Sequence, residues 1–92
     1  AGVKTMNVRT ARWDDLNEYD KIQKHYLITL DSVELINSIV SNGGNTDEDM
    51  DSIRRNVEHL KIMRAKDFWF GQDMSPIDAA ILLGESHIQN EA

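Results

Sequence analysis

The stretch from Trp13 to Ser41 constrains the fold of this chain more than any other feature of its sequence. It contains neither proline nor glycine, and its apolar residues recur at steps of three and four, which is the period of one helix face. The pattern predicts one long helix over roughly residues 13–41. The stripe expected to face a second helix comprises Tyr19, Ile22, Tyr26, Leu30, Val33 and Val40.

Two adjacent glycines, Gly43 and Gly44, follow this helix and are suited to a helix end and a turn that need positive φ. Thr46 is a good N-cap, with Asp49 three residues later as in a capping box. Apolar residues at helical spacing then predict a second helix over about residues 47–66, acidic at its start and basic at its end. A loop this short makes the two helices an antiparallel hairpin.

A second helix-start signal, Ser75 followed by Pro76, opens a short apolar stretch that ends at Gly84. It predicts a short third helix at about 76–83, packed across the open end of the hairpin. The expected fold class is therefore all-α, a long antiparallel helical hairpin with a short third helix.

The length of 92 residues allows one domain. Residues 1–12 show no sustained period and predict a loose N-terminal arm. Residues 13–84 form the single helical domain, and residues 85–92 are expected to be a polar C-terminal tail.

The composition excludes several classes of function. Ten basic against sixteen acidic side chains give a net charge of −6, which disfavours nucleic acid or an anionic membrane as a partner. The absence of cysteine removes disulfides, thiolate catalysis and Cys-zinc sites. No uncharged run is long enough to span a bilayer, and the charged start lacks the apolar stretch of a signal peptide. These observations predict a cytoplasmic protein.

One acidic cluster has the spacing of a calcium loop. Asp47, Asp49, Asp51 and Glu58 occupy positions one, three, five and twelve of that motif. Ser52 stands where the loop needs glycine, and the apolar spacing of the same segment favours a helix. The cluster is therefore interpreted as an acidic helix start, with a cation site as the weaker alternative.

The sequence contains no recognisable arrangement of catalytic residues. The three histidines, His25, His59 and His87, do not cluster, and we expect the first two to be exposed to solvent. No serine or threonine stands in a nucleophile-elbow setting. We predict no enzyme activity and no catalytic, cofactor-binding or metal-ligating residue.

Three consecutive aromatic residues, Phe68, Trp69 and Phe70, interrupt the helical pattern. The favoured interpretation is that they pack against the start of the first helix, near Trp13. Because three neighbouring side chains cannot all face one way, at least one is also a candidate anchor for a protein partner.

The second half of the first helix is apolar on two opposite sides. Leu27, Ile28, Leu35 and Ile39 lie away from the stripe that faces the second helix. An uncovered apolar face of this kind usually marks an interface. We therefore predict self-association through these four residues, as a homodimer or higher homo-oligomer that forms a helix bundle.

The segment NVEHLKIMRAKDFWF (residues 56–70), together with DMSPIDAAI (residues 73–81), resembles the short helical proteins found in tailed-phage and marine environmental genomes. The resemblance implies a small accessory or assembly protein, either cytoplasmic or associated with a virion, and transfers no functional residue. The predicted function is a non-enzymatic interaction or assembly protein. The alternatives are an adaptor that binds another protein through the aromatic segment, and a cation-binding protein.

Overall fold

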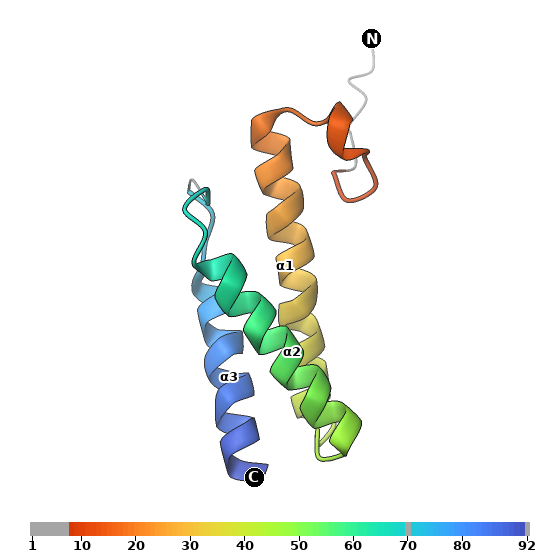
Figure 1. Ribbon diagram of the computed structural model, residues 1–92, viewed down its shortest axis with the longest axis vertical. Helices are drawn as coiled ribbons and strands as arrows, with labels where there is room; N and C mark the ends of the chain where they lie inside the picture. The colour runs from red at the N-terminus through yellow and green to blue at the C-terminus, as the bar shows by residue number, and fades with distance from the viewer. Residues whose placement is uncertain (1–7, 70, 92) are drawn as a thin grey trace.

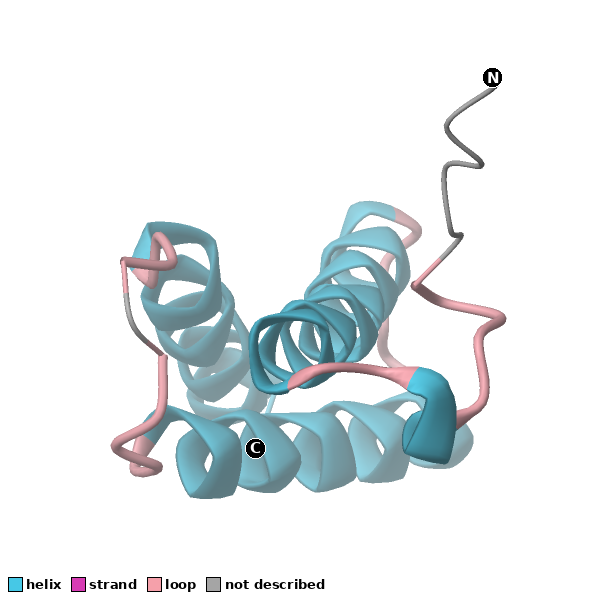
Figure 2. Cartoon of the chain, turned by 90° about the horizontal axis from the view of Figure 1, so that it is seen from above, coloured by secondary structure: helices cyan, strands magenta, loops and turns pink. Residues whose placement is uncertain are grey.

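The regular structure of this chain is helical throughout the part described by the computed structural model, residues 8–69 and 71–91. A 3-10 helix precedes three α-helices: η1 (Trp13–Asp15), α1 (Glu18–Ser41), α2 (Asp47–Arg64) and α3 (Ser75–Glu91). Figure 1 shows α1 and α3 running downward while α2 returns upward, obliquely to both. Figure 2 shows helices and loops, without a strand, over the same described residues. The predicted all-α class is confirmed.

The first long helix begins later than the periodicity predicts. Asn17 caps α1, since its side-chain oxygen accepts a hydrogen bond from the Asp20 backbone N–H at 2.8 Å. Leu16, just before this cap, has extended backbone angles and is buried. Because the N-cap fixes the start of α1 at Glu18, residues 13–15 are separate from it and form the short helix η1.

The turn between α1 and α2 agrees with the sequence prediction. Gly43 and Gly44 both have positive φ, at 104° and 56°. The Thr46 side chain accepts a hydrogen bond from the Asp49 backbone N–H at 3.0 Å, and α2 starts at the next residue after the cap. The predicted hairpin turn and N-cap are confirmed.

The third helix is longer than predicted, and the expected polar tail is wrong. Helix α3 continues through Gly84 to Glu91 instead of ending near residue 83. A Cβ at Gly84 would lie 2.4 Å from Cγ2 of Val57, so this glycine lets α3 approach α2 closely and does not end the helix. One turn later, Ile88 packs against the core.

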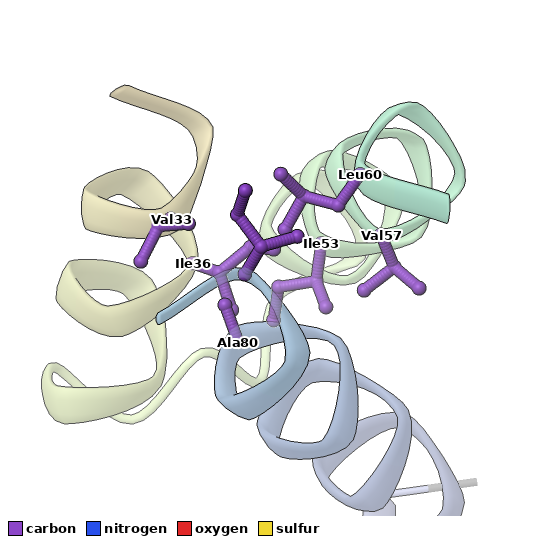
Figure 3. Packing of buried hydrophobic residues seen from close by; sticks show 7 residues of the cluster. Val33, Ile36, Ile53, Val57, Leu60 and Ala80 are labelled. Atoms are coloured by element: carbon purple, nitrogen blue, oxygen red, sulfur yellow. The ribbon is translucent and has the colours of Figure 1, made fainter. Parts of the chain in front are cut away.

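The core lies where the three helices meet, and Figure 3 shows its side chains pointing toward one another. Helix α3 packs along both other helices and does not merely cross an open end. The fully buried Ile36, Ile53 and Leu60 form its centre, and burying an Ile or Leu side chain contributes ~1.5–3 kcal/mol. The buried cluster consists of Val33, Ile36, Ile53, Val57, Leu60, Ile77 and Ala80.

The upper half of α1 extends beyond this core. Figures 1 and 2 both show its N-terminal end between the loop that joins α2 to α3 and the segment before α1. Tyr19, predicted to face the second helix, is 66% exposed there, because α2 ends before it reaches this level. Tyr26, Leu30 and Val40, from the same predicted stripe, pack against the core.

Candidate functional site

The four residues predicted to mediate self-association have different surroundings in the structure. Ile28 and Leu35 are 45% and 44% exposed and lie seven residues apart on α1. Leu27 is half-buried. Ile39 packs against the edge of the core, so its assignment to an uncovered face is wrong. It lies beside the turn, where Gly44 approaches closely.

An outer face of α1, defined here as Lys24, Ile28, Asp31 and Leu35, results from this arrangement. These residues follow one another at steps of four, three and four, and therefore lie on one side of the helix. The two aliphatic side chains alternate along this face with the two charged ones.

The segment before α1, residues 8–16 and called the strap here, forms hydrogen bonds with both charged side chains of this face. The Arg9 guanidinium forms an ion pair with Asp31 and also donates to the Leu27 carbonyl at 3.3 Å. The Lys24 ammonium donates to the carbonyls of Arg9 and Ala11, each at 2.8 Å. Asp31 raises the pKa of the Arg9 guanidinium through this hydrogen bond. Both charges of the outer face are thus satisfied within the chain.

The expectation of a loose arm is wrong for residues 8–12. Arg9 and Ala11 of this segment are hydrogen-bonded to α1. Residues 1–7 lie outside the described residues. Only a structure reveals the strap, because its contacts are made by backbone carbonyls and two long side chains, which carry no periodicity.

The aromatic segment packs against the upper half of α1, as the favoured interpretation predicts. Trp69 is buried, and its indole N–H donates to the Met63 carbonyl at 2.8 Å. Its ring meets the rings of Tyr26 and Phe68 edge-on, at centroid distances of 6.2 and 4.7 Å. Phe70, the third predicted anchor, lies outside the described residues.

A cleft opens beside this segment. Its volume is about 270 Å³. It is lined by Trp13, Glu18, Lys21, Ile22, His25 and Phe68. The His25 ring stacks on Phe68 at 5.3 Å and meets the Trp13 ring edge-on at 4.8 Å. Trp13 remains 43% exposed, and the Lys21 ammonium lies 5.4 Å from the centre of its ring. Aromatic rings therefore form much of the wall of this cleft.

The histidines occupy three separate places. His25 is part of the aromatic stack, so the expectation that it is freely exposed is wrong. His59 is exposed on α2. His87, on α3, lies with Nε2 2.7 Å from the Gly44 carbonyl oxygen and ties the end of α3 to the turn between α1 and α2.

The acidic cluster considered for calcium lies entirely within α2. A helix places Asp47 and Asp51 on one side and directs Asp49 away from them, so the three do not form a ligand loop. Within residues 8–69 and 71–91 no group of three His, Asp or Glu side chains is placed to hold a metal ion.

Comparison with protein-family models, curated proteins and solved structures finds no match to this chain. Among the described helices, none is both long and apolar enough to cross a membrane. The two candidate sites are therefore the outer face of α1 and the cleft beside Phe68.

Proposed function

We propose that this chain is a non-enzymatic interaction module that self-associates through the outer face of α1. One observation carries the proposal: Ile28 and Leu35 each expose nearly half of their surface on one side of α1, while Asp31 beside them is paired with Arg9 and the Lys24 ammonium donates to strap carbonyls. Apolar residues exposed together in this way favour an interface.

The energetics limit any association through this face to a weak one. Full burial of an Ile or Leu side chain is worth ~1.5–3 kcal/mol, and these two are already half covered. Two such residues on each of two chains then contribute on the order of 4 kcal/mol, against which association entropy must be set. The net charge of −6 on each chain also opposes pairing, so added salt should strengthen it.

The test is the mass in solution at high micromolar concentration, measured by light scattering. We expect a mass above one chain for the wild type and the mass of one chain for Leu35→Glu, because a carboxylate cannot be buried in an apolar contact. Ile62→Glu is the matched control, since Ile62 is 53% exposed on α2 and receives the same charge. A wild-type mass of one chain would overturn the proposal.

The proposal involves no catalytic step and no cofactor. The net charge of −6 makes nucleic acid an unfavourable partner. We further propose a cytoplasmic or virion-associated place of action, which rests on the sequence features and the resemblance described above.

The cleft beside Phe68 supports a second candidate, an adaptor that binds another protein. The exposed indole of Trp13 suits an aromatic side chain, and a carboxylate beside that side chain would share the Lys21 ammonium with Glu18, which lies 3.6 Å from it. The probe is N-acetylphenylalanine, and the readout is the NMR signals of the two indole N–H groups. We expect saturable shifts at Trp13 but not at the buried Trp69, and no shift at Trp13 would exclude this use of the cleft.

A further inference from the structure

We propose that Asn42 is a site of spontaneous deamidation, that the folded turn between α1 and α2 suppresses the reaction, and that His87 on α3 holds this turn closed. The reaction is independent of the self-association through α1. It takes place at the Asn42–Gly43 pair, where the hairpin needs a helix end followed by positive φ.

The modification needs no enzyme, and water is its only co-reactant. The backbone nitrogen of Gly43 attacks Cγ of Asn42 and forms a new C–N bond. The Cγ–Nδ2 bond breaks, and ammonia leaves with the proton that the Gly43 N–H gives up. The product is a five-membered succinimide ring. Water then opens this ring at either carbonyl, which yields aspartate or isoaspartate at position 42.

The sequence makes Asn42 the preferred asparagine for this reaction. A glycine has no Cβ, so its backbone nitrogen is the least hindered nucleophile that can follow an asparagine. A Cβ at Gly43 would meet nothing within 4 Å, so the space around the reacting atoms is open. Every other asparagine in the sequence is followed by a residue with a side chain. Asn45, which precedes Thr46 in the same turn, is therefore an internal control.

The folded turn holds the reacting atoms apart. Ring formation requires Cβ of Asn42 and the Gly43 nitrogen to be nearly eclipsed about the Cα–C bond. The ψ of 14° at Asn42 nearly eclipses the two backbone nitrogens instead, which leaves Cβ about a third of a turn away. The Gly43 N–H donates to the Val40 carbonyl at 3.1 Å. The Nδ2 group of Asn42 donates to the Ser38 carbonyl at 2.9 Å, so both reacting groups are held in this arrangement.

His87 supplies the long-range contact that keeps the turn closed. Gly44 is buried, and its carbonyl oxygen accepts a hydrogen bond from Nε2 of His87 at 2.7 Å, across 43 residues of chain. A Cβ at Gly44 would lie 2.8 Å from the same nitrogen, so the ring and the turn are closely packed. Rotation of ψ at Asn42 toward the ring geometry moves Gly44. The reaction therefore requires the contact with His87 to break.

The product weakens the turn in which it forms. Deamidation removes the Nδ2 donor to the Ser38 carbonyl and places a carboxylate at the C-terminal end of α1, where the helix dipole disfavours negative charge. The isoaspartate form also lengthens the main chain before Gly44 and displaces its carbonyl from His87. The modified chain should therefore lose the connection between the turn and the end of α3.

The site and its suppression are tested by following deamidation of the whole chain at neutral pH by peptide mass spectrometry, without urea and in urea that unfolds it. We expect Asn42 to react roughly tenfold or more slowly in the folded chain, because only the open turn reacts. In urea, Asn42 should react much faster than Asn45. Equal rates for Asn42 with and without urea would overturn the suppression by the turn. Equal rates for Asn42 and Asn45 in urea would overturn the assignment of the site.

Two histidine variants test the contact with α3. His87→Ala should speed the reaction of the folded chain by about two- to tenfold, which corresponds to the loss of one hydrogen bond. Hydrogen exchange at the Gly43 N–H should rise by a similar factor, since the same opening exposes it. His59→Ala is the matched control, because His59 is exposed on α2, and it should leave both rates unchanged.

The rate in urea separates the holding role of His87 from a direct chemical effect. With the turn unfolded, His87→Ala and the wild type should deamidate at the same rate. A difference between them in urea would mean that the imidazole acts on the reaction itself, and this result overturns the holding role. An unchanged or slower reaction in folded His87→Ala overturns it as well.

Discussion

The two ends of α1 are held by different kinds of contact. Its lower half meets α2 and α3 through aliphatic side chains, of which Ile36 is fully buried. Its upper half meets the loop before α3 and the strap through ring contacts and single hydrogen bonds, and Tyr26 joins it to the edge of the core. Trp13 is 43% exposed at this upper end. Continuous aliphatic burial is therefore expected to supply most of the stability at the lower end, whereas the upper end is less tightly covered.

The first prediction concerns the aliphatic core and has the largest expected effect. Leu60→Ala should lower the free energy of unfolding by ~2–5 kcal/mol, because a fully buried side chain is replaced by a cavity. Urea unfolding followed by circular dichroism measures the change. Trp13→Ala is the comparison variant, and it should cost clearly less than Leu60→Ala. Equal losses for the two variants would contradict the difference between the ends.

The second prediction concerns the upper end. The Tyr26 hydroxyl donates to the Asp73 carbonyl at 2.6 Å and joins α1 to the loop before α3. Tyr26→Phe should cost about 1 kcal/mol, the usual net value of one hydrogen bond. Hydrogen exchange should show the increase in local opening mainly around residues 65–74. A loss as large as that of Leu60→Ala would mean that the upper end is part of the stabilising core.

The same residue gives a pH dependence. Burial, assisted by the negative charge of Asp73, raises the pKa of Tyr26 above its ordinary value of 10.0. The unfolded chain therefore releases this proton first, and the stability associated with it is present below pH 10 and lost as the pH rises through the folded value. The difference in stability between wild type and Tyr26→Phe should shrink in that range, as measured by urea unfolding at several alkaline pH values.

Local signals in the sequence predict local structure well in this chain. The glycine pair, the Thr46 cap and the apolar spacing place the turn and α2 almost where the structure has them. Each depends on residues within about one helical turn, so no distant contact can easily override them. The start of α1 is predicted less well, because the periodicity extends through Trp13 while the cap is at Asn17.

Gly84 shows where a local signal misleads. A glycine after an apolar stretch is typical of a helix end, yet here it lies within α3 because Val57 leaves no room for a Cβ. Ile39 shows the same limit for burial, since its angle around α1 predicts an uncovered face and the close turn at Gly44 covers it. Both errors arise from contacts between residues distant in the sequence.

The amino-acid sequence by itself determined the all-α class, the hairpin of the first two helices and the presence of apolar residues on a second side of α1, because these depend on periodicity, caps and glycines. The tertiary structure decided which of those residues stay exposed. Ile28 and Leu35 remain uncovered, Ile39 does not, and Arg9 pairs with Asp31. Side-chain neighbours across 18 to 22 residues of chain are set by how the helices and the strap pack together, and helical spacing contains no information about that packing.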